Sequence, residues 1–243
     1  MRTARFFCDT ITQNDTVTIS DIQFRHLAKV LRLKPGDCVE LFDGKGTVAD
    51  AVIEKISKDS AVLKIQTKNL FEPRSNRRII IAASMAKAQR FEQVVEMCSQ
   101  LGIDRIMPVI FERTVKQADS EIAVRRFESI AIESAKQCGR IFLPIIDKPL
   151  SFEKALENLQ TDYPQAKIIF GSLAENIESI INLDFGSEDC LVFIGPEGGL
   201  TETEENLLMK INAKPVGLTD TILRIETAAI AFASILAANR AAG

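Results

Sequence analysis

The chain has 243 residues, of which 46% are hydrophobic, and a formal net charge of −3 at pH 7. This length suffices for one large or two modest domains with a buried core, and the charge balance gives no overall indication of nucleic acid as a partner. Five cysteines without a C-x-x-C pair and a single histidine argue against a disulfide framework or a zinc site, so we expect no metal. No apolar run approaches the ~20 residues of a membrane span, and the first ten residues lack the apolar core of a signal peptide. The composition therefore predicts a soluble cytoplasmic protein.

The first 70 or so residues alternate apolar and polar positions in short runs, which is typical of β-strands. Turns are predicted at "LKPGD" and "DGKG", and one amphipathic helix over 22–32 interrupts the strands. We expect a small β-barrel over 1–72, followed by a linker that begins near Pro73. The stretch "FRHLAKVLR" places a basic candidate RNA-facing patch on the helix, with ordinary surface charges as the alternative. Its members are Arg25, His26, Lys29 and Arg32.

From Ile79 onward, strands alternate with helices, which predicts an α/β domain with a parallel sheet over 73–243. "IIIAASMA", "DRIMPVI", "KIIFGS" and "LVFIG" are the expected strands. The helices are "RFEQVVEMCSQLG", closed by Gly102, a second that ends at Gly139, and a last one that begins near Glu226. The glycine fingerprints of Rossmann and P-loop nucleotide sites are missing, and one histidine without a G-x-S-x-G partner gives no serine triad.

The stretch "FIGPEGGLTETEE" runs from an apolar strand through two glycines into a capped helix. Thr201 followed by Glu204 fits a capping box, so a helix is expected to start at Thr201. Such a turn usually attracts phosphate, but four glutamates lie in or beside this one, and no Lys or Arg occurs between Lys167 and Lys210. The favoured ligand is therefore neutral or cationic, and the alternative is a plain connection between strand and helix.

A second turn lies in "KPVGLTDTILRIETAAIAFASIL". It contains a short strand around Val216, an irregular loop over 218–223, and then Arg224 and Glu226 at the opening of an alanine-rich helix. The alanines predict close packing against another helix in the core, with a subunit contact as the alternative.

Together these motifs resemble the RsmE group of SPOUT methyltransferases. The resemblance rests on "FIGPEGGLTETE", "LTDTILRIETA", "KAQRFEQVVEMCSQLGIDRIMPVIFERTVK" and "SAKQCGRIFLP", with "RHLAKVLRLKPGD" and "LFDGKG" in the first part of the chain. It implies a PUA-like RNA-binding barrel and a SPOUT α/β domain with a trefoil knot. It also implies a homodimer that uses S-adenosylmethionine to methylate N3 of one uridine in 16S rRNA of the small ribosomal subunit.

Carried over to this chain, the resemblance implies three sets of residues. The donor S-adenosylmethionine would be held by Gly171, Ser172, Ile194, Gly195, Pro196, Glu197, Gly198, Gly199, Leu218, Ile222, Leu223 and Arg224. Arg224 would stabilise the uracil anion, and Glu226 or Glu197 would accept the N3 proton. Arg113 and Arg140 would join Arg224 on the RNA side, with surface salt bridges as the alternative reading.

The chain departs from the group's usual pattern in the donor loop. Thr219 and Thr221 stand where a glycine and an arginine are usual, a change expected to alter donor affinity. Because of this departure, an alternative function remains: a catalytically weakened RNA-binding or ribosome-assembly protein with the same fold. A methyltransferase with another RNA target, or one acting on a ribose 2′-hydroxyl, is a further alternative.

Overall fold

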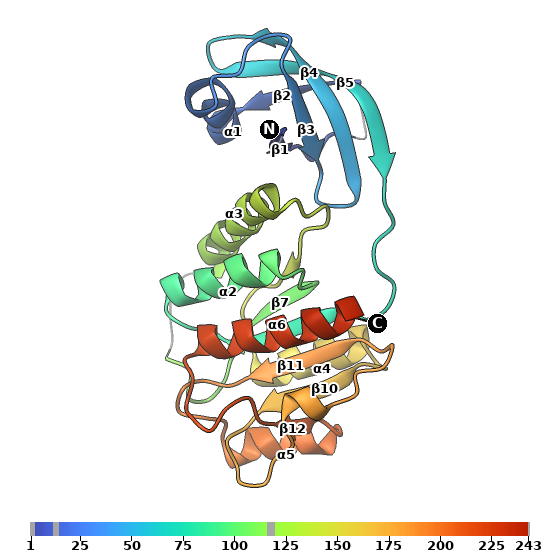
Figure 1. Ribbon diagram of the computed structural model, residues 1–243. Helices are drawn as coiled ribbons and strands as arrows, with labels where there is room; N and C mark the ends of the chain where they lie inside the picture. The colour runs from blue at the N-terminus through green and yellow to red at the C-terminus, as the bar shows by residue number, and fades with distance from the viewer. Residues whose placement is uncertain (1–2, 12–14, 116–119, 243) are drawn as a thin grey trace. The chain divides into compact units, whose positions relative to one another are not determined.

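The computed structural model describes residues 3–11, 15–115 and 120–242, which form two compact units. The first consists of Met1–Pro73 together with Ala135–Leu143, and the second of Arg74–Ser134 together with Pro144–Gly243 (Figure 1). The sequence-based division at 72/73 did not place the later segment with the first unit. That segment is held there by contacts with the strands: Arg5 donates to the carbonyl of Ala135 at 2.9 Å, and Leu143 donates to the carbonyl of Gly44 at 2.9 Å.

The first unit is a curled sheet of five strands in the order β1-β3-β4-β5-β2, where the sequence predicted a small β-barrel of short strands. Its strands are β1 (Ala4–Phe7), β2 (Thr16–Ser20), β3 (Cys38–Phe42), β4 (Thr47–Ile56) and β5 (Ser60–Leu70). All neighbours are antiparallel except β1 and β3, which are parallel with Ala4 opposite Val39. Two register shifts between β4 and β5 bend these long strands around a core that includes Phe6, Leu41 and Leu63.

The helix predicted over 22–32 is present but irregular. It begins as α1 (Asp21–Arg25) and continues as a π-helix (η1, His26–Val30), in which Leu31 donates to the carbonyl of His26 at 2.9 Å. Phe24 and Leu27 are buried against the sheet. Arg32 lies beyond the helical turns with a φ of 54°, so a regular helical spacing does not describe its position relative to Arg25.

The second unit is built on a parallel sheet in the order β12-β10-β11-β6-β7-β8, with β9 beside β7. The strands are β6 (Ile79–Ser84), β7 (Arg105–Ile110), β8 (Ile145–Ile146), β9 (Leu150–Ser151), β10 (Lys167–Gly171), β11 (Cys190–Ile194) and β12 (Lys214–Val216). Every residue of β6 and β11 is buried. This confirms the prediction from their continuous apolar runs, which are typical of central strands covered on both faces.

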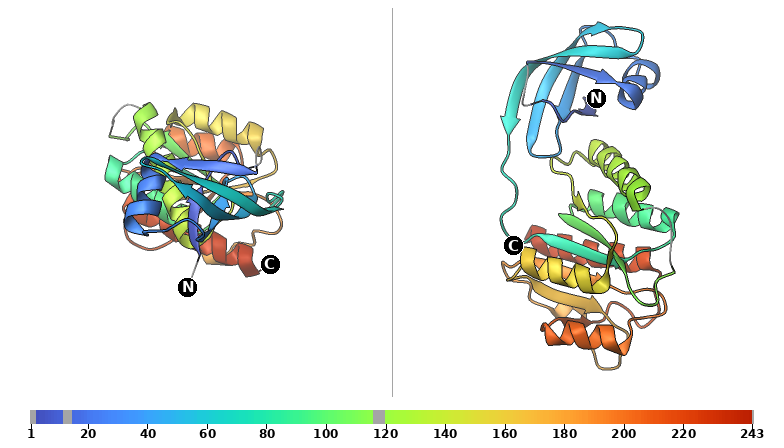
Figure 2. Two further views of the ribbon diagram at one scale, coloured as in Figure 1. Left: turned by 90° about the horizontal axis from the view of Figure 1, so that it is seen from above. Right: turned by 180° about the vertical axis from the view of Figure 1, so that it is seen from behind.

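Five helices of the described residues cover the two faces of this sheet (Figures 1 and 2). They are α2 (Ala88–Gln100), α3 (Ser120–Cys138), α4 (Phe152–Asp162), α5 (Glu202–Lys210) and α6 (Ile225–Ala242), and a 3₁₀ turn, η2 (Ile180–Asn182), follows β10. Helices α4 and α5 share one hydrophobic core with the sheet, while α2 and α6 pack together on the opposite face. The helix α4 was not predicted, although Ser151 caps it and its buried residues recur at helical spacing.

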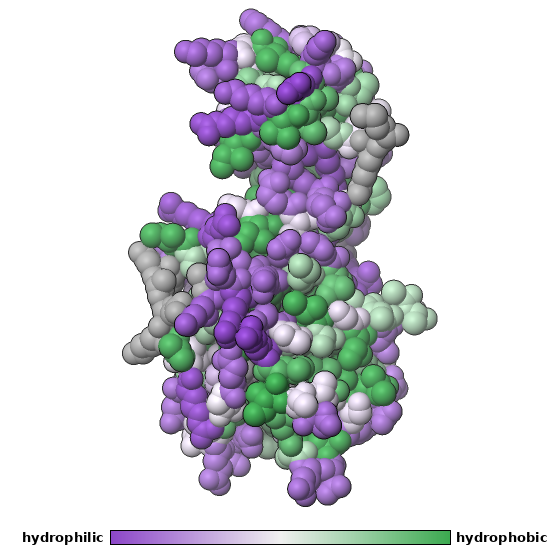
Figure 3. Space-filling model, turned by 60° about the vertical axis from the view of Figure 1, so that its left-hand side comes forward, coloured by the Kyte–Doolittle hydropathy of each residue, from purple (hydrophilic) through white to green (hydrophobic). Residues whose placement is uncertain are grey.

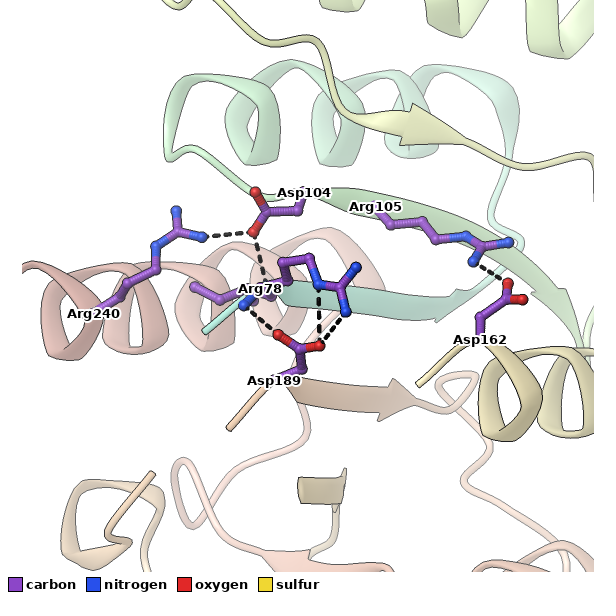
Figure 4. Close-up of polar contacts among 7 residues, drawn as sticks. Arg78, Asp104, Arg105, Asp162, Asp189 and Arg240 are labelled. Atoms are coloured by element: carbon purple, nitrogen blue, oxygen red, sulfur yellow. Dashed lines mark hydrogen bonds and ion pairs between the residues drawn. The ribbon is translucent and has the colours of Figure 1, made fainter. Parts of the chain in front are cut away.

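Arginine and aspartate side chains join the amino ends of the central strands (Figure 4). Asp189 accepts from the backbone N–H of Arg78 at 2.7 Å and from the Arg78 guanidinium, whose pKa it raises mainly through these hydrogen bonds. Asp104 accepts from the backbone of Ile79 and from Arg240 near the end of α6. These contacts tie α6 to the sheet at the edge opposite to the loops described below. Among the described residues, no helix has the length and hydropathy that a membrane crossing requires.

Candidate active site

A cavity of about 330 Å³ lies at the carboxyl ends of β10, β11 and β12. Its walls come from three loops, over 171–174, 194–200 and 216–223, and it also touches Glu205 of α5 and Ala228 and Phe232 of α6. Figure 3, which brings this end of the sheet toward the viewer, shows hydrophobic side chains gathered on this part of the second unit. A crevice beyond the carboxyl ends of parallel strands is where open α/β sheets bind their ligands, so this cavity is the candidate site.

The cavity brings together ten of the twelve residues predicted to hold the donor. They are Gly171, Ser172, Ile194, Gly195, Pro196, Glu197, Gly199, Leu218, Ile222 and Leu223. Gly198 and Arg224 do not line the cavity: the first belongs to the same loop but faces Arg113, and the second is exposed just before α6. The sequence did not predict several other lining residues, which are Leu173, Ala174, Leu200, Glu205, Val216, Ala228 and Phe232. The donor-binding role of all these residues stays a prediction.

The first and third loops are joined at their base by backbone hydrogen bonds. Ser172 donates to the carbonyl of Val216 at 2.9 Å, Ile180 donates to the carbonyl of Gly217 at 3.0 Å, and Gly217 donates to that of Glu178 at 3.0 Å. The Ser172 bond continues the pairing of β10 with β12, and the other two hold the segment that follows the first loop beside Gly217, so that both loops lie at one end of the sheet. The trefoil knot that the resemblance implies stays a prediction.

The glycine-rich loop closes as a tight turn in which Gly199, with a φ of 74°, donates to the carbonyl of Pro196 at 2.9 Å. A side chain is disfavoured at this angle, which explains a glycine there. Immediately after the turn, Thr201 and Glu204 form the predicted capping box. Thr201 is the N-cap, and α5 begins at Glu202, one residue after the expected start. Glu204 is buried, and its Oε1 also accepts from the backbone N–H of Glu112 at 2.8 Å, so the capping residue ties this loop to the one that follows β7.

Two arginines from other connections hold the glycine-rich loop. Arg113 donates from Nη1 to the carbonyls of Gly198 at 2.7 Å and of Leu200 at 3.2 Å, so the side chain predicted to face RNA already contacts this loop. Its RNA contact stays a prediction. Arg90, which the sequence did not predict, donates from Nη1 to Oε1 of Glu197 at 2.7 Å. The sequence did contain a signal for a role of Arg90 in the site: it lies at the start of the helix that follows β6, and that helix begins at the carboxyl edge of the sheet.

The cavity is acidic at its rim and apolar inside. Glu197 and Glu205 are the charged residues that line it, and the described lining residues include no lysine or arginine. Ile194, Leu223 and Phe232 supply apolar surface. Such a site favours a ligand with an apolar ring and a positive charge over a phosphate. No cluster of three or more metal-ligating side chains occurs among the described residues.

The two unusual threonines of the third loop bond to each other. The Thr219 hydroxyl accepts from the backbone N–H of Thr221 at 3.1 Å and donates to its carbonyl at 3.0 Å. A glycine at position 219 could form neither bond. Thr219 therefore makes the turn rigid with a side chain, and both threonines line the cavity.

The three predicted catalytic residues differ in their surroundings. The Arg224 side chain is exposed and makes no hydrogen bond or ion pair with any residue that the structure describes. Glu226 is buried, and its Oε2 has no hydrogen-bond partner in the described part of the chain. Glu197 is paired with Arg90, whose Nε also lies 3.9 Å from Oε1 of Glu226.

The remaining RNA-binding candidates belong to the first unit. Arg25, Lys29 and Arg32 are exposed, as expected for a basic patch. His26 is half-buried with its ring edge-on to Phe6, at 6.2 Å between centroids, so part of its surface serves packing. Arg140 lies in the 135–143 segment that packs with this unit. RNA contact by each of these residues stays a prediction.

Comparison with known proteins decides the family. A family model described as an RNA methyltransferase domain matches residues 73–237, and one described as an RNA methyltransferase PUA domain matches 19–66. The chain belongs to this RNA methyltransferase family. Its methyltransferase domain thus contains the cavity and all three loops, and the curled sheet is its PUA-like domain.

Several similar proteins carry the same name. The ribosomal RNA small subunit methyltransferase E of Synechocystis is 29% identical over 219 residues, which are 88% of this chain and 70% of that protein. The protein of the same name from Bacillus subtilis is 28% identical over 232 residues, 90% of this chain and 88% of its own. A crystal structure of the Neisseria gonorrhoeae protein of this name, bound to S-adenosylmethionine, is 27% identical, has a TM-score of 0.83 and is covered over 96% of both chains.

Proposed function

We propose that this RNA methyltransferase transfers a methyl group from S-adenosylmethionine to N3 of one uridine in the 16S rRNA of the small ribosomal subunit. The observation that carries the proposal is the cavity at the carboxyl ends of the strands, which has an apolar interior and two glutamates at its rim. The GPEGG loop and the segment before α6 form much of its wall. The similarity to ribosomal RNA small subunit methyltransferases E, one of them crystallised with S-adenosylmethionine, supports it.

The residues of the cavity fit this donor. When bound, S-adenosylmethionine supplies a methyl group on a positively charged sulfur, which needs no further activation. Glu197 and Glu205 provide the negative charge that a sulfonium favours, and Leu218 and Leu223 provide apolar surface for the adenine ring. The Gly195 and Gly199 positions let a ligand approach the main chain closely.

Three residues are proposed to act on the uracil. The N3 proton must leave as the methyl group arrives, so the ring needs a proton acceptor and a cation that stabilises its anion. Arg224 suits the second role because its guanidinium has no partner among the described residues. Glu226 and Glu197 are the candidate acceptors, and the carboxylate that takes the proton becomes neutral as N3 is methylated.

The proposal includes the partners and the compartment. The basic residues Arg25, Lys29 and Arg32 of the PUA-like domain are proposed to contact the RNA, whose phosphates favour lysine and arginine. We also propose that the protein works as a homodimer in the cytoplasm, where the small subunit is found.

The test is transfer of labelled methyl from S-adenosylmethionine to small ribosomal subunits purified from cells that lack the gene, followed by mass spectrometry of the nucleosides. Appearance of 3-methyluridine at one site would support the proposal. A 2′-O-methylated nucleoside would assign the activity to ribose instead. If neither transfer nor donor binding occurs, a weakened RNA-binding protein with this fold becomes the better reading.

A variant separates donor binding from transfer. Arg224→Ala should bind the donor almost as the wild type does, because Arg224 does not line the cavity although the resemblance implied donor contact. It should transfer methyl about 10²- to 10³-fold more slowly, because it loses a charge that acts on the anion. Arg126→Ala is the matched control, since Arg126 pairs with Glu92 on helices α3 and α2 and does not line the cavity. Equal transfer rates in Arg224→Ala and the control would reject the role of Arg224.

A further inference from the structure

Arg90 lies between two carboxylates that belong to different parts of the site. It comes from the first turn of α2, and its Nη1 donates to Oε1 of Glu197 in the glycine-rich loop at 2.7 Å. Its Nε lies 3.9 Å from Oε1 of Glu226 in the first turn of α6. One guanidinium thus faces residues that are 107 and 136 positions away along the chain, and the resemblance to known methyltransferases assigned it no role.

The carboxylate of Glu226 shows why a cation is needed at this place. Its side chain is 10% exposed, and its Oε2 has no hydrogen-bond partner among the described residues. A buried charge without a partner is costly, and Arg90 is the ion-pair partner that the structure gives it. Because Arg90 faces only Oε1, the second oxygen keeps its capacity to accept a hydrogen bond.

We infer that Arg90 is a positioning residue of the methyltransferase site, which holds the glycine-rich loop over 194–200 through Glu197 and orients the Oε2 atom of Glu226. The inference rests on the proposed function and deepens it, because it names the group that connects this loop to the helix bearing the predicted catalytic residue Glu226. It also separates the two candidate proton acceptors: Glu197 is held by a short ion pair, whereas Glu226 has an oxygen available.

The geometry requires an arginine. The Nε and Nη1 atoms of one rigid, planar group point to two different carboxylates, which the single ammonium of a lysine cannot do with the same fixed angle. Arg113 holds the other side of the loop through the carbonyls of Gly198 and Leu200. Loss of Arg90 should therefore release Glu197 and leave the turn between Pro196 and Gly199 in place.

The experiment is a double-mutant cycle between Arg90 and Glu197, with S-adenosylmethionine as the probe. Titration calorimetry gives the donor Kd, and methyl transfer at saturating donor gives the turnover number. We expect the Kd to rise about tenfold in Arg90→Ala, because the loop must then be ordered by the donor itself. Glu197→Ala should raise the Kd at least as much, because it also removes a carboxylate that lines the cavity. The double variant should bind no more weakly than Glu197→Ala, since the ion pair is already broken there.

Turnover at saturating donor tests the link to Glu226. The turnover number should fall about tenfold or more in Arg90→Ala. It should fall less in Arg90→Lys, which keeps the positive charge but lacks the planar guanidinium. Arg126→Ala is the control, because it breaks only the surface ion pair with Glu92. It should leave both Kd and turnover within about twofold of the wild type. Thermal unfolding of each variant shows whether it folds, and should Arg90→Ala fail to fold, Arg90→Lys and Glu197→Ala carry the comparison.

Each outcome decides the inference. Equal Kd and turnover in the wild type and the Arg90 variants would overturn it and leave the proposed function standing. Multiplying effects in the double variant, about a hundredfold in Kd, would also overturn it, because the two residues would then act independently. If the wild type itself neither binds the donor nor transfers methyl, the proposed function fails, and the inference fails with it.

Discussion

Removal of the Glu204 side chain should destabilise the methyltransferase domain far more than removal of a glutamate only two residues away. Glu204 sits in the first turn of α5 and is 5% exposed. Its Oε1 accepts from the backbone N–H of Glu112 at 2.8 Å, and its Oε2 accepts from the backbone N–H of Thr201 at 2.8 Å. The substitution Glu204→Ala leaves both N–H groups without their acceptors.

The size of the effect follows from these two donors. A buried N–H that loses its partner costs about 1–3 kcal/mol. The Thr201 N–H is buried and that of Glu112 is only partly buried, which gives about 2–5 kcal/mol for the pair. Relief from burying the Glu204 charge offsets part of this cost. We expect the free energy of unfolding to fall by about 3 kcal/mol in Glu204→Ala. Glu204→Gln should cost about 1–2 kcal/mol, because its amide keeps one acceptor oxygen for one of the two donors.

Urea denaturation followed by circular dichroism measures these free energies. The control is Glu202→Ala, because Glu202 is exposed in the same turn and contributes only its interaction with the helix dipole, about 0.3–1 kcal/mol. Hydrogen exchange provides a local readout, since the amide of Glu112 should exchange faster in Glu204→Ala but not in Glu202→Ala. The reasoning is refuted if the two alanine variants are equally stable, or if the Glu112 amide stays protected without its acceptor.

Three further predictions concern other parts of the methyltransferase domain. Thr219→Ala removes the acceptor for the Thr221 amide and should weaken donor binding by calorimetry about fivefold, whereas Thr219→Ser keeps the acceptor and should bind as the wild type does. Burial raises the pKa of the Cys190 thiol from 9.0 to about 12, so the unfolded chain loses this proton first; the free energy of unfolding should fall as pH rises from about 9 to 12, and less steeply in Cys190→Ala. Asp189→Asn removes the charged acceptor of Arg78 at the amino edge of the sheet; it should cost about 1–3 kcal/mol in urea unfolding but leave donor affinity within about twofold.

The elements that the sequence predicted well are those with signals inside a short stretch. The capping box of Thr201 and Glu204 placed the start of α5 to within one residue, and the apolar runs of β6 and β11 predicted central strands buried on both faces. Gly102 closes α2 with a φ of 82°, as a glycine beyond a helix end should. These predictions succeed because caps, turns and periodicity act between residues a few positions apart.

Other local features were missed or incompletely predicted. The helix α4 had a usable signal in Ser151 and the apolar spacing that follows it. The π-helical turns after Arg25 had no such signal in the sequence. Hydrogen bonds between residues five positions apart depend here on how Phe24 and Leu27 pack on the sheet. The parallel pairing of β1 with β3 is also invisible in strand patterns, which specify faces but not neighbours.

The sequence by itself determined the central strands, several helix caps, and the two loops, one rich in glycine and one with two threonines, whose joint resemblance pointed to an RNA methyltransferase. The tertiary structure alone decided how these loops are held. Arg90 meets Glu197 across 107 positions, and Glu112 meets Glu204 across 92. The physical reason is that the parallel strands bring their carboxyl ends to one edge of the sheet and so bring these distant residues together. No local pattern encodes which side chains then come within hydrogen-bonding distance.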